Sequence, residues 1–183
     1  MVYMYLAEGF EEVEAFAPLD LLRRAGVDVR TVGVGGKTVR GSHGIEVHAD
    51  LAAEEALPDP EPEMIILPGG MPGTTNLDAS AEVDAMLRYA AERGIYIAAI
   101  CAAPTILGKR GMLSGRQAVC YPGMEKQLGD AVVLTRPVVV DENIITARGM
   151  GAALEFGIVL CELLCGEECA RQLRYRTVMK TAD

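Results

Sequence analysis

Residues 95–107 read Ile-Tyr-Ile-Ala-Ala-Ile-Cys-Ala-Ala-Pro-Thr-Ile-Leu, and this stretch decides the fold. Its first half, residues 95–100, is an apolar run with the length of a buried parallel strand. The second half reads as the start of a helix, because Pro104 suits the first helical turn, where a missing N–H costs nothing. Cys101 lies between the two. It therefore sits at the carboxyl end of a strand, where open α/β sheets place their reactive groups.

Short apolar runs and amphipathic segments alternate along the rest of the chain. We expect strands at residues 2–7, 27–34, 64–67 and 95–100, two or three more within 131–147, and helices at 11–25, 81–92, 152–164 and 167–176. This alternation predicts an α/β fold with a mostly parallel sheet covered by helices on both faces. The Pro-rich segment 58–62 reads as a surface loop, so we expect a single domain over residues 1–183.

The composition indicates which binding partners and which cellular compartment the protein is expected to have. The net charge of −9 argues against nucleic acid and against an anionic membrane surface. No apolar run is long enough to cross a bilayer, and the first residues lack the basic segment of a signal peptide. The five cysteines are irregularly spaced and odd in number, which suits free thiols better than a disulfide framework. We therefore expect a cytoplasmic protein that binds neither nucleic acid nor a membrane.

The helix after Cys101 directs the positive end of its dipole at the thiol, which favours the thiolate. The alternative is an inert cysteine buried at a strand end. Gly69 and Gly70 follow the strand at 64–67 and belong to the same sheet edge. Glycines there let backbone N–H groups approach a ligand, although they also occur in ordinary turns.

The first helix begins with an acidic segment, which often does no more than complement the helix dipole. Glu14, however, shares a helix face with Phe10 and Ala17, so we expect it to point inward while Glu11 and Glu12 face water. A buried carboxyl has a raised pKa and can donate a hydrogen bond to a thiolate. The periodicity alone leaves both interpretations of Glu14 open.

Cys161, Cys165 and Cys169 are spaced by four residues, like ligands on a metal-binding face. Gly166 interrupts the helix between them, and no histidine or further cysteine lies nearby in the sequence. Core packing is therefore the better interpretation, and we expect no metal site.

Five segments of the chain together resemble the ThiJ/PfpI superfamily, at residues 6–14, 18–26, 67–70, 98–104, and 146–149 with 155–156. Their order and spacing are specific, and the match is closest to the branch that includes the parkinsonism-associated protein deglycase. The resemblance runs from about residue 3 to residue 173. It implies a single ThiJ/PfpI-like domain, related to the class I glutamine amidotransferases, with a flavodoxin-like three-layer sandwich. It also implies a homodimer.

The resemblance further implies roles for individual residues. Cys101 matches the oxidation-prone cysteine of the family's nucleophile elbow, which has a strained backbone. Glu14 matches the protonated glutamate beside that thiolate. Gly69, Gly70 and the N–H group of Ala102 match the oxyanion pocket.

Five more residues match positions beside the pocket or at the dimer interface. Arg24 matches an arginine near the dimer-side pocket, and Asp20 an acidic residue near the interface. His43 replaces an arginine and would reach the partner's pocket in an isologous dimer that buries part of residues 14–24. Tyr121 stands where close relatives have a histidine, so a Cys–His dyad is missing. Arg148 follows a strand and could reach the edge where Cys101 lies, or be a surface charge.

Two functions fit this reasoning. In the first, the protein is a cofactor-free enzyme whose cysteine attacks small reactive carbonyls, converting methylglyoxal to lactate or releasing glycated adducts. In the second, it is a non-enzymatic redox-sensing or chaperone-like stress protein that uses oxidation of Cys101. Ala102 follows the cysteine where the protease branch has a histidine, which argues against a peptidase.

Overall fold

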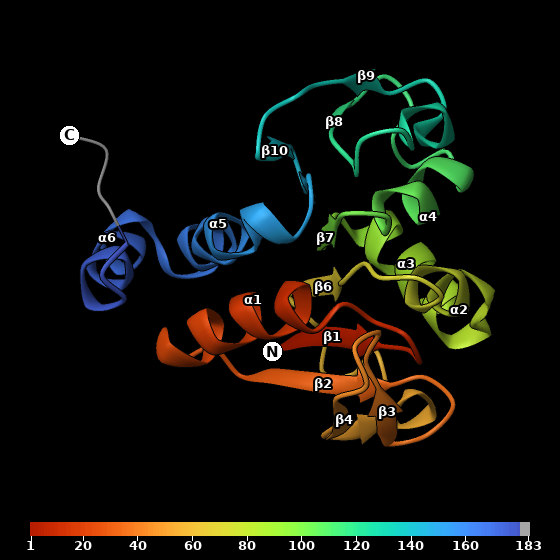
Figure 1. The fold of residues 1–183 in the computed structure, drawn as a ribbon, viewed down its shortest axis with the longest axis horizontal. Coiled ribbons are helices and arrows are strands. Elements are labelled where there is room, and N and C mark those ends of the chain that lie inside the picture. Colours follow the sequence, from red (N-terminus) through yellow and green to blue (C-terminus); the bar gives the residue numbers. More distant parts are fainter. Residues whose placement is uncertain (180–183) are drawn as a thin grey trace.

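The computed structural model describes residues 1–179 and contains one central sheet of seven strands (Figure 1). The strands, in sheet order, are β10 (Val138–Asp141), β11 (Ile144–Ala147), β7 (Tyr96–Ile100), β6 (Met64–Leu67), β1 (Val2–Leu6), β2 (Val29–Gly33) and β5 (Leu51–Ala52). All neighbouring strands are parallel except β10 and β11, which form an antiparallel hairpin. The mostly parallel sheet expected from the sequence is confirmed.

Helices cover both faces of this sheet (Figure 1). One layer contains α1 (Glu12–Arg24), α5 (Ala153–Cys165) and α6 (Glu167–Arg176), and the other contains α2 (Gly73–Ala79), α3 (Ala81–Arg93) and α4 (Pro104–Lys109). Smaller elements are the hairpin of β3 (Thr38–Arg40) and β4 (Glu46–His48), the pair β8 (Gln117–Ala118) and β9 (Val132–Val133), and the 3-10 helices η1 (Ala53–Glu55), η2 (Glu125–Leu128) and η3 (Met150–Ala152). The predicted three-layer α/β sandwich is confirmed.

Two hydrophobic cores lie between these layers. Alternate residues of a strand point to opposite faces, so Tyr5 of β1 packs toward α3 while Met4 packs toward α1 and α5. The helices α1 and α5 approach each other closely at Gly157, where a Cβ atom would lie 2.8 Å from the Cα atom of Pro18. This contact fixes the position of α1 and of the acidic residues in its first turn.

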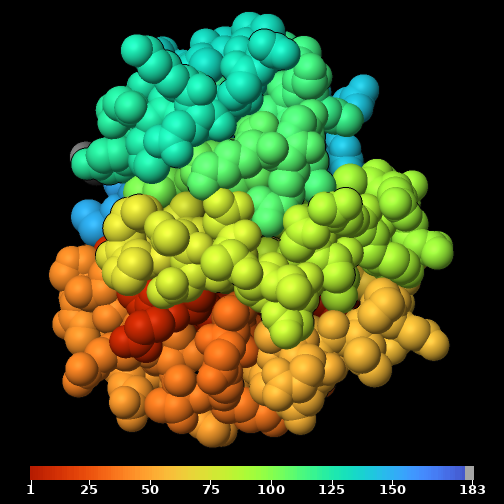
Figure 2. Space-filling model, turned by 90° about the vertical axis from the view of Figure 1, so that its right-hand side faces the viewer, coloured from red at the N-terminus to blue at the C-terminus, as the bar shows by residue number. Residues whose placement is uncertain are grey.

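No helix within residues 1–179 is long and apolar enough to cross a membrane. The strands β1 and β2 run toward the side of the molecule that Figure 2 faces. On that side the segment after β6 (yellow) lies between the N-terminal segments (red and orange) and residues 100–135 (green to teal) (Figure 2). The loops that follow β1, β6 and β7 therefore meet at one edge of the sheet.

Candidate active site

Cys101 directly follows β7 and has a φ angle of 66°, in the left-handed region that non-glycine residues rarely adopt. Its N–H group donates a hydrogen bond to the carbonyl of Ala147 at 2.9 Å, and its own carbonyl accepts one from the N–H group of Tyr121 at 2.7 Å. These bonds tie the turn to β11 and to the segment after β8. The strained backbone implied by the family resemblance is confirmed.

Glu14 reaches the same edge from the first turn of α1 and is only 1% exposed. One of its carboxyl oxygens, Oε2, accepts a hydrogen bond from the N–H group of Gly69 at 3.1 Å, and the carboxyl is also hydrogen-bonded to the Cys101 thiol. Gly69 has no room for a side chain, because a Cβ atom would lie 2.5 Å from Glu14 Oε2 and 2.6 Å from the Cβ atom of Cys101. The inward orientation predicted for Glu14 is therefore confirmed.

The thiol and the carboxyl change each other's protonation. Burial raises the pKa of Glu14 to about 7, although hydrogen bonds from Cys101 and from backbone N–H groups lower it. Burial and then the charge of Glu14 raise the pKa of Cys101 to about 12, although the N–H groups of Ala102 and Gly70 lower it. Between these two values the pair holds one proton and one negative charge.

The sequence suggested a thiol that readily forms the thiolate, but burial and the charge of Glu14 raise the pKa of Cys101 overall. The helix that follows Cys101, α4, spans only Pro104–Lys109, and no side chain caps its N-terminus. Burial of the sulfur and the carboxylate beside it outweigh the N–H groups of Ala102 and Gly70, which lower the pKa. A reactive thiolate therefore requires that the remaining proton of the pair move to Glu14.

A cavity of about 380 Å³ opens beside the thiol, lined by Gly70, Met71, Cys101, Ala102, Tyr121, Pro122, Gly123 and Met124. The backbone N–H groups of Ala102 and Gly70 are hydrogen-bonded to the Cys101 sulfur, and both residues line the cavity. Tyr121 is 53% exposed at the cavity wall. The cavity thus offers a nucleophile, two N–H donors and a largely apolar wall for a small substrate.

Four of the residues expected beside the pocket or at the dimer interface do not line this cavity: Asp20, Arg24, His43 and Arg148. Asp20 and Arg24 lie toward the other end of α1, are both more than half exposed, and form an ion pair with an Oδ2–Nε distance of 2.6 Å. Arg24 lines a separate hollow together with Leu173 and Arg176. Arg148 is an exposed neighbour of the site and does not line the cavity. The dimer-side roles of these residues remain predictions.

His43 pairs with Glu12, a residue whose role the sequence did not indicate. The backbone N–H group of His43 donates a hydrogen bond to Glu12 Oε1 at 2.8 Å. The ring atom Nδ1 of His43 lies 2.9 Å from Glu12 Oε2. Burial raises the pKa of Glu12, but hydrogen bonds from His43 and from backbone N–H groups outweigh it and lower the pKa to about 2. The hydrogen bond with Glu12 raises the pKa of His43.

The expectation that Glu11 and Glu12 face water is wrong. Glu12 is 5% exposed and the Glu11 side chain 13% exposed, because the β3–β4 hairpin places His43 over them. The ligand atoms of Glu11, Glu12 and His43 lie within 4.8 Å of one another, close enough for a metal ion to bridge them. In this structure Nδ1 of His43 lies 3.3 Å from Glu11 Oε2 and 2.9 Å from Glu12 Oε2, and we assign no metal to the three residues.

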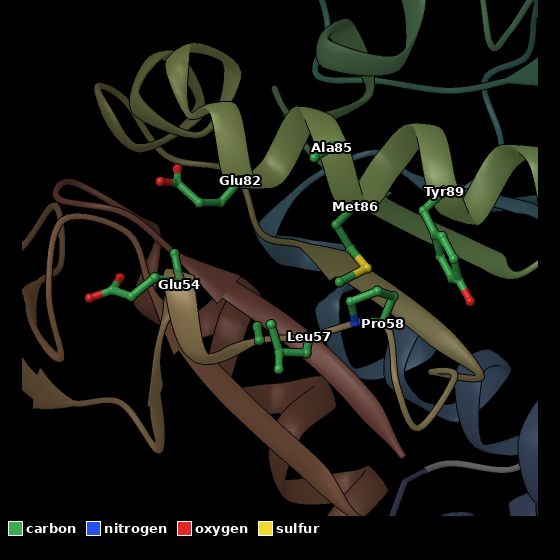
Figure 3. Close-up of a pocket in the computed structure, with 9 residues that line it drawn as sticks. Glu54, Leu57, Pro58, Glu82, Ala85, Met86 and Tyr89 are labelled. Atoms are coloured by element: carbon green, nitrogen blue, oxygen red, sulfur yellow. The ribbon is translucent and has the colours of Figure 1, made fainter.

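A second cavity of about 380 Å³ lies between η1 and α3 (Figure 3). It is lined by Ala53, Glu54, Ala56, Leu57, Pro58, Glu82, Ala85, Met86 and Tyr89. Figure 3 shows the carboxylates of Glu54 and Glu82 near one end and the Tyr89 ring near the other. This lining contains no cysteine and shares no residue with the cavity beside Cys101. The first cavity is therefore the candidate active site.

A strained cysteine at a strand-to-helix turn of an α/β sandwich defines a nucleophile-elbow protein. The model of the DJ-1/PfpI family matches residues 1–163, and the chain belongs to that family. Protein dj-1beta of Drosophila melanogaster is 39% identical over 171 residues, which are 92% of this chain and 91% of that protein.

Two further relatives bear on function. Glutathione-independent glyoxalase DJR-1.2 of Caenorhabditis elegans is 31% identical over 167 residues, covering 91% of this chain and 89% of that protein. The solved structure of oxidized Toxoplasma gondii DJ-1 is 35% identical, has a TM-score of 0.93 and covers 98% of both chains. The resemblance to the ThiJ/PfpI superfamily is thereby confirmed over nearly the whole chain.

Proposed function

We propose that this protein is a cofactor-free enzyme of the glyoxalase type that converts small 2-oxoaldehydes, such as methylglyoxal, to hydroxy acids. One observation carries the proposal: the buried carboxyl of Glu14 lies beside the partly exposed thiol of Cys101, and the thiol opens into a cavity with N–H donors at the sulfur. The relative that is named a glutathione-independent glyoxalase supports it. Release of glycated adducts would begin with the same attack on a carbonyl carbon.

The reaction begins when the proton of the pair rests on Glu14 and the sulfur of Cys101 is a thiolate. The thiolate attacks the aldehyde carbon, and the carbonyl oxygen takes the proton of Glu14, which gives a thiohemiacetal. The N–H groups of Gly70 and Ala102 stabilise the negative charge that develops on this oxygen.

Glu14 is now a carboxylate and can act as a general base. It removes the hydrogen of the former aldehyde carbon as a proton, which gives an enediolate. Glu14 then returns this proton to the neighbouring carbon while the hydroxyl proton passes to the former ketone oxygen, and the adduct becomes a thioester of the hydroxy acid. Water then hydrolyses the thioester, releases the hydroxy acid and restores the Cys101 thiol. The net reaction adds one water to the 2-oxoaldehyde.

Lactate formation from methylglyoxal tests this proposal. We expect Cys101→Ser to abolish lactate formation, because a serine hydroxyl in this position is far less nucleophilic than a thiolate. Cys165→Ser, a change at an exposed cysteine outside the cavity, is the matched control and should retain full activity. Equal rates for the wild type and Cys101→Ser would contradict the proposal.

A redox-sensing or chaperone-like role is the second candidate. Two observations favour it: Tyr121 occupies the place of the family histidine, and an oxidized form of a relative has been solved. Cys101 is partly exposed, and a protonated Glu14 and two N–H groups could hold a sulfinate there. Mass spectrometry after mild peroxide treatment tests this role by comparing the oxidation of Cys101 with that of the other cysteines. If sulfinic acid forms at Cys101 no more than at Cys161, this role fails.

We further propose a cytoplasmic homodimer that binds neither nucleic acid nor membranes. The net charge of −9 disfavours both of those surfaces, and five free thiols suit a reducing compartment. The outer face of α1 is the proposed interface. It presents an exposed or partly exposed stripe at helical spacing, formed by Val13, Phe16, Ala17, Asp20 and Arg24.

A further inference from the structure

The proposed reaction does not use the three cysteines near the junction of α5 and α6. Cys161 is buried, Cys169 is partly buried and Cys165 is exposed. Core packing, the interpretation favoured by the sequence, therefore explains Cys161 but is wrong for Cys165. An exposed cysteine with a second thiol beside it needs another explanation.

The backbone brings Cys165 and Cys169 together at this junction. Cys165 is the last residue of α5, and Cys169 lies in the first turn of α6. Between the two helices stands Gly166, whose φ of 87° and ψ of 164° lie far from helical values. The chain therefore turns at this glycine and places the Cys169 thiol near that of Cys165. Burial, followed by this neighbouring thiol, raises the pKa of Cys165.

The same geometry rules out a bond between Cys161 and Cys165. These residues are one turn apart within α5, where Cβ atoms are about 5–6 Å apart. A disulfide needs Cβ atoms about 3.5–4.5 Å apart. Cys165 and Cys169 are not held at this helical Cβ–Cβ distance, because the helix is broken between them at Gly166. Residues 165–168 are exposed and Cys169 is partly exposed, so solutes can reach the junction.

The pair is also separate from the candidate active site. Gly149, just before η3 and α5, borders the Cys101 sulfur, because a Cβ atom there would lie 3.9 Å from it. Cys165 lies at the opposite end of α5, whose 13 residues span about 20 Å. Direct exchange between Cys101 and these thiols is excluded by this distance.

We propose that Cys165 and Cys169 form a second thiol site, which low-molecular-weight disulfides such as oxidised glutathione convert reversibly to an intramolecular disulfide. One cysteine thiolate attacks a sulfur of the glutathione disulfide and releases one glutathione thiolate. The other cysteine thiolate then attacks the mixed disulfide and releases the second. Two protein thiols are oxidised, one glutathione disulfide is reduced, and the two protons lost by the protein go to the two glutathione thiolates.

Thiol mapping of the full chain in the Cys101→Ser background tests the proposal without interference from the elbow cysteine. The protein is equilibrated in glutathione buffers of increasing oxidation, quenched with acid, alkylated and analysed by mass spectrometry. We expect oxidising buffers to remove two alkylatable thiols of the four that remain from the original five, in a peptide lighter by two hydrogen atoms. A reducing buffer should restore both thiols.

Two matched variants make the result specific. Cys169→Ser should replace the intramolecular bond with a glutathione adduct at Cys165, whereas Cys161→Ser should retain the bond between Cys165 and Cys169. The proposal is overturned if both cysteines stay alkylated across the whole series. It is also overturned if Cys165 pairs with Cys161 or with a second copy of the chain.

Discussion

Folding raises the pKa of Glu14, and this makes the stability of the protein depend on pH. The pKa rises from 4.5 to about 7 because the carboxyl is buried beside the Cys101 sulfur. The folded state therefore binds this proton more tightly than the unfolded state does. The stabilisation is complete below pH 4.5, and it is lost as the pH rises through 7.

The size of the effect follows from the two pKa values. A carboxyl whose pKa rises from 4.5 to about 7 contributes about 3 kcal/mol to the free energy of unfolding at low pH. Between pH 5 and pH 8 the expected loss is about 2.5 kcal/mol, because a small part of the change lies below pH 5. Glu14→Gln has no titrating group at this position, so it should lack this part of the pH dependence.

Urea denaturation of the wild type and of Glu14→Gln at pH 5, 6, 7 and 8 measures the effect. The difference between the two free energies of unfolding cancels the contributions of groups that titrate in both proteins, including His43. We expect the wild type to lose about 2.5 kcal/mol of its free energy of unfolding, relative to the variant, as the pH rises from 5 to 8. A difference that stays constant with pH would show that Glu14 titrates as an ordinary exposed carboxyl and refute the reasoning.

Three further predictions concern the surroundings of the site. Gly69→Ala should destabilise the protein by about 1–3 kcal/mol in urea and lower lactate formation, because its Cβ atom would lie 2.5 Å from Glu14 Oε2; unchanged stability would contradict this packing. His43 should titrate above 6.5 by NMR and return toward that value in Glu12→Gln, whereas identical titrations would exclude their hydrogen bond in solution. Light scattering should give a dimer for the wild type and a monomer for Val13→Arg, and a wild-type monomer at micromolar concentration would reject the interface on α1.

The position of the candidate site could be predicted because it depends on where elements begin and end. Cys101 follows a strand that is apolar throughout, and Gly69 follows another, so the parallel topology brings them to one edge. The helical spacing of Glu14 from the buried Phe10 similarly predicted that the Glu14 carboxyl points inward, but it did not predict that Glu12 is buried as well. These features can be recognised from neighbouring residues in the sequence. The parallel sheet then brings the residues that follow its strands together at one edge.

Other features depend on contacts between distant segments and could not be predicted. The hairpin of β3 and β4 is short and largely exposed, so it lacks the apolar run that marks a strand. Without it, nothing related His43 to Glu12, which lies 31 residues earlier. The exposure of Cys165 depends on how the chain turns at Gly166, and the raised pKa of Cys101 depends on burial and on the charge of Glu14.

The most direct test of the account is the effect of Glu14→Gln on lactate formation and on alkylation of Cys101, measured in the same preparation. Glutamine keeps an N–H donor for the thiolate but has no proton to transfer. The variant also lacks the carboxylate charge that raises the pKa of Cys101, so we expect alkylation of Cys101 to be retained or faster. Lactate formation should nevertheless fall by about 100- to 10,000-fold, as when a general acid–base group is lost. If both rates stay at the wild-type level, Glu14 takes no part in the chemistry and the proposed mechanism is wrong.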